Sequence, residues 1–155
     1  ERVRPKPLYG ETYCFLTQKD GPFQSRSAVS WSEAADVPLC LLTSDMQNRR
    51  IIDSVFRSIG RKPQTAFETN SFVSLCAQVA VGALSSIVPA QMLGAIGLPD
   101  TVAAHPLIEP DVSRLVGLVI PQREPLAALV EALFAQAEAP AAAPMSRFNT
   151  PDRDF

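Results

Sequence analysis

The middle of the sequence alternates apolar runs of strand length with segments whose apolar residues recur at helical spacing. Val37 to Thr43 is a continuous apolar run, and Met46 to Ile59 follows with apolar residues on one helical face. Next come a strand-like Gln64 to Thr69, a helix-like Ser71 to Val81 and a strand-like Leu84 to Val88. Strands that alternate with helices over short connections predict an α/β fold with a doubly wound parallel sheet.

The flanking segments show weaker patterns of the same kinds. Leu8 to Gln18 is predicted as one strand rich in Tyr, Thr and Phe, and Ser30 and Glu33 have the spacing of a capping box at the start of a short helix. Residues 138–155 are Ala/Pro-rich and then polar, so we expect them to be disordered. The remaining predicted elements are a short helix at Ala90 to Ile96, strands at Val102 to Ile108 and Arg114 to Ile120, and an amphipathic helix at Pro125 to Gln136.

Charge and cysteine content limit the class of protein. Fourteen basic and sixteen acidic residues give a net charge of −2 without a block of one sign, so this chain offers no evident surface for nucleic acid. Cys14, Cys40 and Cys76 are far apart and flanked by apolar residues, which favours reduced core cysteines over disulfides or a metal site.

The start lacks the apolar region of a signal peptide, and the longest apolar stretches are too short to cross a bilayer. We therefore expect a cytoplasmic protein without cofactor, metal or membrane partner.

Polar residues gather where two predicted parallel strands lead into helices. Thr43 and Ser44 follow the first of these strands, and Thr69, Asn70 and Ser71 follow the second. Ligands of open parallel sheets bind outside the carboxyl ends of the strands, and helix N-termini attract anions. These five residues are therefore candidates to hold a small carboxylate or similar anion.

The same residues also fit a purely structural role. Ser44 and Gln47 have capping-box spacing, and Asn70 is among the best N-cap residues, so both junctions can simply satisfy their own helices. Capping and ligand binding both stay open at this point.

The sequence does not predict an enzyme. GxSxG, Walker and GxGxxG motifs are absent, and no nucleophile, base and orienting group come together. His105 is the only histidine and lacks neighbours at metal-ligand spacing, so we expect a surface or packed histidine. Arg49 and Arg50 are expected on a solvated helix face rather than in an anion clamp.

Several short motifs follow one another in a fairly specific order and spacing. They are Leu8 to Leu16, Val37 to Leu42, Asn48 to Phe56 with Gly60 and Pro63, Glu68 to Ser71, Val79 to Gly82, and Ile87 to Pro89. Together they resemble the effector-binding domain of LysR-type transcriptional regulators, over roughly residues 8–137.

This resemblance implies a two-lobed fold like that of type 2 periplasmic binding proteins, with a small-molecule inducer held between the lobes. Residues 25–108 would form the second lobe, and residues 1–24 with 109–137 part of the first. Family inducer contacts match Thr43, Ser44, Thr69, Asn70 and Ser71. The family's helix-turn-helix domain and the front of its first lobe have no counterpart in this sequence, so DNA binding would rest on a domain absent from this chain.

The resemblance also implies partners: a small-molecule effector, which the polar helix starts predict to be anionic, and self-association as a dimer or tetramer. A solute-binding protein of a transport system is the alternative, since it shares the fold, but it requires export. A small flavodoxin-like enzyme ranks third, because it requires a phosphate loop or a catalytic cluster.

A first lobe without its opening strands is expected to expose a sheet edge at residues 8–18 or 113–121. Because unpaired edges pair with other chains, we predict dimerisation or strand exchange. Gel filtration over a range of concentrations checks this, and a monomer at every concentration would contradict it.

Overall fold

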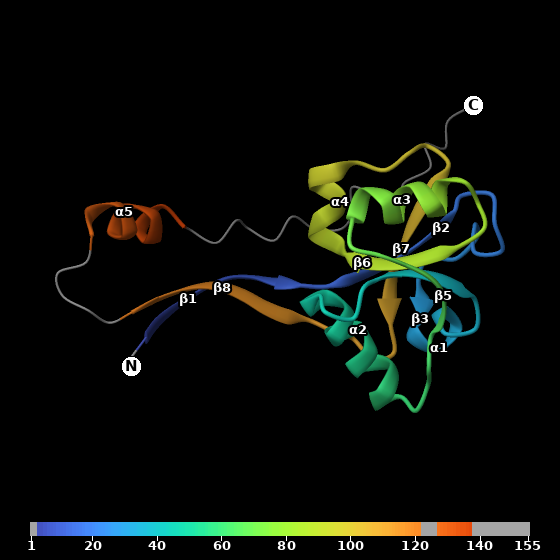
Figure 1. The fold of residues 1–155 in the computed structure, drawn as a ribbon, viewed down its shortest axis with the longest axis horizontal. Helices are drawn as coiled ribbons and strands as arrows, with labels where there is room; N and C mark the ends of the chain where they lie inside the picture. The colour runs from blue at the N-terminus through green and yellow to red at the C-terminus, as the bar shows by residue number, and fades with distance from the viewer. Residues whose placement is uncertain (1–2, 122–126, 138–155) are drawn as a thin grey trace. The chain divides into compact units, whose positions relative to one another are not determined.

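A computed structural model describes residues 3–121 and 127–137 of the chain (Figure 1). The chain divides into two compact units: unit 1 comprises residues 1–11 and 114–155, and unit 2 comprises residues 12–113. The predicted disordered tail and Pro125, the predicted start of the last helix, lie outside the described residues.

The boundaries between the two units differ from the lobe boundaries that were expected from the family resemblance. Residues 12–24 and 109–113 cluster with unit 2, although they were expected in the first lobe. Residues 12–24 join unit 2 through the strand at residues 13–18, which hydrogen-bonds on both sides to strands of unit 2.

Unit 2 is built on a six-stranded sheet in the order β3-β7-β2-β6-β4-β5. As the alternating pattern predicts, β4 runs parallel to both β5 and β6. The strand β2 lies between β6 and β7 and is antiparallel to both. The strands are β2 (Tyr13–Gln18), β3 (Val29–Ser30), β4 (Pro38–Leu42), β5 (Gln64–Thr69), β6 (Ser85–Pro89) and β7 (Val102–Ile108).

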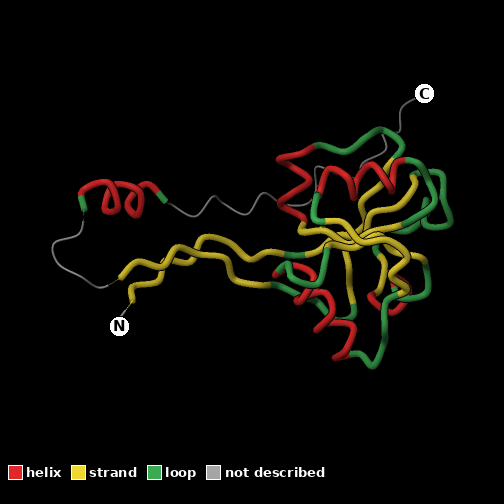
Figure 2. Tube along the Cα trace, in the orientation of Figure 1, coloured by secondary structure: helices red, strands yellow, loops and turns green. Residues whose placement is uncertain are grey.

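Helices cover both faces of this sheet (Figures 1 and 2). Two of them, α1 (Trp31–Ala34) and α2 (Gln47–Ser58), pack on one face, and α3 (Phe72–Ala80) and α4 (Ala90–Ile96) pack on the other. Successive side chains of a strand point to opposite faces, so β4 must be apolar at every buried position. The run Leu39 to Leu42 is accordingly buried throughout, and its residues alternate between the two cores.

The two cores differ in chemistry. The core under α1 and α2 is aromatic: Trp31 packs edge-on against Phe56 with ring centroids 5.4 Å apart, and Phe15 packs similarly against Phe23 at 5.0 Å. The core under α3 and α4 contains Cys14, Cys40 and Cys76, which are free and buried, as predicted for core cysteines. Burial raises the pKa of the Cys14 and Cys40 thiols to about 11, so both stay protonated at neutral pH.

Unit 1 contains a two-stranded antiparallel ribbon of β1 (Val3–Glu11) and β8 (Arg114–Pro121), followed by the helix α5 (Ala128–Gln136). At Gly117 the strands approach closely, and a Cβ there would lie 2.6 Å from the Lys6 carbonyl oxygen. Lys6 Nζ donates to the Phe134 carbonyl at 2.6 Å, and the Arg4 guanidinium lies 4.6 Å from the Phe134 ring centroid. The last predicted helix is present as α5, and none of its residues is buried.

The predicted single strand over residues 8–18 is two strands, β1 and β2, which belong to different units. Because β2 lies in the interior of its sheet, residues 13–18 are not an exposed edge, and that part of the prediction is wrong. The strands β1 and β8 pair with each other, so among the described residues each still has one edge without a strand partner. Pro5 and Pro7 in β1 cannot donate backbone hydrogen bonds, which suits an edge strand.

The predicted capping box at the start of α1 is confirmed. The Ser30 hydroxyl accepts from the Glu33 backbone N–H, and the Glu33 carboxylate accepts from the Ser30 backbone N–H. Those hydrogen bonds from Ser30, with help from Arg26, lower the pKa of Glu33 below its ordinary value of 4.5. This stabilisation is therefore fully present above pH 4.5 and is lost as the pH falls through the lowered pKa.

We predict that Glu33→Gln, which keeps an acceptor but cannot titrate, reduces the loss of stability below pH 4.5 by about 0.5 kcal/mol, a small value because the carboxylate is partly solvated. Urea unfolding at a series of pH values measures it. The matched control is Asp111→Asn, which neutralises an exposed loop carboxylate and should keep the parent's pH dependence. Equal acid sensitivity of parent and Glu33→Gln would contradict the prediction.

Candidate functional site

The two polar junctions selected from the sequence lie side by side in unit 2. Thr43 directly follows β4, and Thr69 is the last residue of β5. Leu42 and Thr69 are register partners, and the Thr43 backbone N–H donates to the Thr69 carbonyl at 3.0 Å. Parallel pairing therefore brings the starts of α2 and α3 to the same end of the sheet.

The second junction includes a helix cap, although not at the predicted residue. Ser71, rather than Asn70, is the N-cap of α3, and its hydroxyl accepts from the Ser74 backbone N–H at 3.3 Å. The Thr69 hydroxyl accepts from the Ser71 N–H at 3.2 Å. The Asn70 side chain is exposed and makes no hydrogen bond with the rest of the described chain.

The first junction lacks the predicted capping box. The N-cap of α2 is Met46, whose side chain makes no capping hydrogen bond, and Ser44 and Gln47 are exposed. The chain turns here through a hydrogen bond of 3.0 Å from the Met46 N–H to the Thr43 carbonyl. The first N–H groups of α2 are thus without a side-chain acceptor, and they carry the positive end of the helix dipole.

One carboxylate already lies at this helix start. A hydrogen bond from the Thr43 side chain, and one from its own backbone N–H, lower the pKa of Asp45. Asp45 is fully exposed, so its charge is hydrated and can move away. The junction therefore stabilises a negative charge next to Thr43, which is the property an anion site requires.

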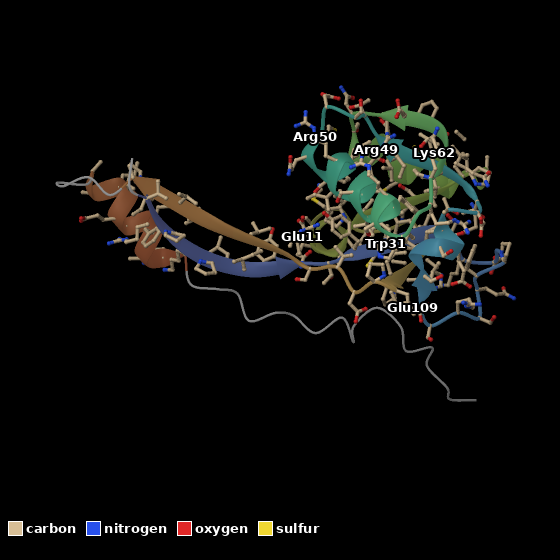
Figure 3. The ribbon with its side chains drawn as sticks, turned by 90° about the horizontal axis from the view of Figure 1, so that it is seen from below. Glu11, Trp31, Arg49, Arg50, Lys62 and Glu109 are labelled. Carbon is tan, nitrogen blue, oxygen red and sulfur yellow. The ribbon has the colours of Figure 1, made fainter. Side chains whose placement is uncertain are left out.

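Arg49 is the feature of this region that the sequence interpretation missed. It was expected on a solvated helix face, but it is only 8% exposed, whereas its neighbour Arg50 is exposed (Figure 3). Arg49 donates to the Leu42 carbonyl at 2.7 Å and to Asp53 at 2.9 Å, and it also binds Glu68. It therefore joins α2 to the carboxyl ends of both β4 and β5, at the residues that directly precede Thr43 and Thr69.

The charge of Arg49 is balanced inside this cluster. Burial alone would lower the pKa of Arg49, but the hydrogen bonds and charges of Glu68 and Asp53 outweigh it and raise the pKa. The Asp53 partner follows the i, i+4 spacing of helical ion pairs, and that spacing is the signal in the sequence that would have indicated a paired arginine. Glu68 is distant in sequence, so only the β4–β5 pairing brings it near.

The other candidates from the sequence lie elsewhere. His105 is buried in β7, opposite Phe15 in β2, and its Nδ1 lies 2.9 Å from the Arg26 carbonyl. Burial lowers its pKa, which favours the neutral ring expected of a packed histidine. Within residues 3–121 and 127–137, no group of three or more His, Cys, Asp or Glu side chains is arranged to hold a metal ion.

Sequence comparison decides the family. The model of the LysR substrate binding domain matches residues 1–141. The chain belongs to this family. A probable nitrogen assimilation transcriptional activator from Synechococcus elongatus is 25% identical to this LysR domain over 117 residues, which are 76% of this chain and 38% of that protein.

Solved structures show the fold. The effector-binding domain of QuiR, solved with shikimate, is 18% identical, with a TM-score of 0.72 over 87% of this chain and 63% of that one. The Synechocystis CcmR regulatory domain, solved with 2-PG, is 12% identical, with a TM-score of 0.76 over 87% of this chain and 65% of that one. The reduced form of OxyR is 26% identical, with a TM-score of 0.67 over 87% of this chain and 63% of that one.

The predicted fold class is thus confirmed as α/β of the type 2 periplasmic-binding-protein kind. The family is one of transcriptional-regulator domains, as expected from the motif order. This LysR domain spans less than two thirds of the relatives compared above. None of the helices described in the structure has the length and apolar character needed to span a membrane.

We predict that Arg49→Met destabilises unit 2 by about 2 kcal/mol, because it leaves Asp53, Glu68 and the Leu42 carbonyl without their shared donor. This loss is smaller than for a fully buried ion pair because both carboxylates are partly exposed. Arg49→Lys is the matched control: it keeps the charge but cannot reach three acceptors with one planar group, so an intermediate loss is expected. Denaturant unfolding measures both variants, and equal stability of all three proteins would contradict the role of Arg49.

Proposed function

We propose that this chain is the sensing part of a LysR-type transcriptional regulator, and that its effector is a small anion bound at the junctions after β4 and β5. Thr43, Ser44, Thr69, Asn70 and Ser71 are the proposed contacts. The observation that carries the proposal is the hydrogen bond from the Thr43 N–H to the Thr69 carbonyl, which places both polar turns and both helix starts together.

The electrostatics of the first junction favour a negatively charged effector. The start of α2 has no side-chain cap, and Thr43 already stabilises the Asp45 carboxylate. An effector carboxylate or phosphate can take the place of Asp45 on the Thr43 hydroxyl and on the free N–H groups. Asn70 and Ser44, whose side chains are exposed, add further hydrogen-bonding groups without removing an existing bond.

The proposed mechanism is a shift in the conformational equilibrium of the regulator. An effector changes that equilibrium only to the extent that it binds one conformation more tightly. Arg49 links both junctions to α2, so an effector bound at the junctions can change the position of this helix. In the whole protein, we propose that dimers or tetramers pass this shift to a separate helix-turn-helix domain that binds the DNA.

The family match favours a regulatory domain over a solute-binding protein of a transport system. Cytoplasmic location and the absence of enzymatic activity are parts of the proposal. They follow from the role of a DNA-bound regulator and from a site that offers binding groups rather than a nucleophile and base.

We predict that one of a panel of anions stabilises the protein. The panel is acetate, succinate, phosphate and sulfate, each at the same ionic strength as a chloride control. An effector at 100 times its dissociation constant should raise the free energy of unfolding by about 2.7 kcal/mol. Thermal unfolding measures the shift in midpoint, and a double variant, Thr43→Val with Asn70→Ala, should lose it.

Thr65→Val is the matched control, because Thr65 lies near the start of β5, away from the junctions. It should keep the response of the parent. A panel anion that stabilises the parent and the double variant equally would show that it binds elsewhere. If none of the anions stabilises the parent, the anionic character of the effector is wrong.

A further inference from the structure

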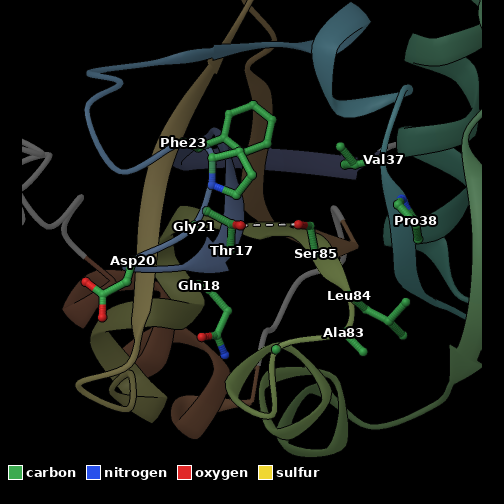
Figure 4. Close-up of a pocket in the computed structure, with 12 residues that line it drawn as sticks. Thr17, Gln18, Asp20, Gly21, Phe23, Val37, Pro38, Ala83, Leu84 and Ser85 are labelled. Carbon is green, nitrogen blue, oxygen red and sulfur yellow. Dashed lines mark hydrogen bonds between the residues drawn. The ribbon is translucent and has the colours of Figure 1, made fainter.

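A pocket of about 300 Å³ lies in unit 2 at the end of the sheet opposite the two junctions (Figure 4). Pro38 at the start of β4 and Ser85 at the start of β6 both line it, whereas Thr43 follows the far end of β4. Thr43 follows Pro38 by five positions along the strand, which is roughly 16 Å. The volume is at the lower end of the range of about 300–1,000 Å³ that small-molecule pockets occupy.

Two buried hydroxyls lie at the centre of this pocket. Thr17 is 4% exposed and Ser85 is 9% exposed, and their oxygens are 3.3 Å apart. Hydroxyl pairs usually approach to about 2.7–2.8 Å, so this contact is weak. When Ser85 donates to Thr17, the Thr17 O–H has no acceptor among the described residues. One of the two hydroxyl protons is therefore available to donate to an oxygen atom of a molecule in the pocket.

Three apolar side chains lie around the hydroxyls. Phe23 faces the pocket and is fixed by its edge-on packing against Phe15, and Val37 and Leu84 line other sides (Figure 4). Gln18 also lines the pocket, but its amide N–H₂ is already bound to the carbonyls of Val79 and Ala80 at the end of α3. Apolar side chains therefore lie on several sides of the Thr17–Ser85 pair, while Gln18 and Asp20 supply the other polar side chains of the lining.

The charge of the lining argues against an anion. Asp20 is the one charged side chain among the described residues that line the pocket, and no lysine or arginine faces it there. Figure 4 places Asp20 at the border, away from the central hydroxyls. An anion would meet a like charge without a compensating cation, while an uncharged molecule loses nothing by contact with the apolar walls.

We propose that this pocket is a second ligand site, which takes a small uncharged molecule consisting of one ring and one hydroxyl or carbonyl oxygen. The ring packs between Phe23 and the aliphatic side chains of Val37 and Leu84. The oxygen accepts from Thr17. The site differs from the junctions after β4 and β5 in place and in charge preference, and it does not depend on the function proposed for them.

Phenol is the probe that tests this site, because it combines one ring with one hydroxyl. Titration of the ¹⁵N-labelled protein, followed by ¹H–¹⁵N correlation spectra up to about 10 mM phenol, detects a millimolar dissociation constant. We expect saturable shifts confined to the amides around the pocket, those of Gly21, Phe23, Gly82 and Ala83. Toluene lacks the oxygen and should bind about fivefold more weakly, and benzoate should leave these amides unshifted.

Variants separate the pocket from general surface binding. Thr17→Val keeps the shape but removes the donor, so phenol should bind about fivefold more weakly and no better than toluene. Ala83→Phe fills the pocket from its exposed rim and should abolish the shifts. Ala77→Phe, the control on the exposed side of α3, should bind phenol as the parent does. The dispersion of each spectrum shows directly whether the variant is folded.

Three outcomes would overturn the proposal. They are phenol shifts that do not saturate or spread over the whole domain, equal binding of phenol to the parent and to Ala83→Phe, and tighter binding of benzylamine than of phenol. The last result would assign the pocket to a cation held by Asp20 instead of an uncharged molecule.

Discussion

Burial of the sheet on both faces is the constraint on which the rest of unit 2 depends. β4 is covered by α2 on one side and by α3 on the other, so each of its residues from Leu39 to Leu42 must be apolar. Polar groups are consequently excluded from the body of the strand and gather at its two ends. The anion site proposed at Thr43 and the pocket beside Pro38 lie at these ends for the same reason.

Arg49 shows how the polar end of such a sheet is stabilised. A buried guanidinium is tolerated because two carboxylates and a carbonyl share its donors. The same contacts fix Leu42 and Glu68, each of which directly precedes a polar junction. The stability of the strand ends and the geometry of the proposed effector site therefore depend on the same side chain, Arg49. Such a shared contact couples the proposed binding site to the fold of unit 2.

Elements with a strong period were predictable from the sequence, because their pattern reflects local geometry. The strands β4 to β7 and the helices α2 to α4 lie within a residue or two of the predicted positions, and the Ser30–Glu33 box forms as its spacing indicates. Predictions that depended on a choice among neighbouring polar residues were less successful. Ser71 caps α3 instead of Asn70, and Met46 precedes α2 without a polar cap, since the actual turn decides which hydroxyl reaches which N–H.

The sequence by itself determined the alternation of strands and helices, the apolar core and the polar character of the two junctions, because each of these follows from residues close together in the chain. The tertiary structure alone decided that β2 enters the sheet between β6 and β7, that Glu68 meets Arg49, and that Thr17 faces Ser85. These contacts join residues far apart in sequence, and the energy that selects them comes from packing the whole sheet. No local pattern records that energy, so the burial of Arg49 and the pocket beside Pro38 became visible only in the folded chain.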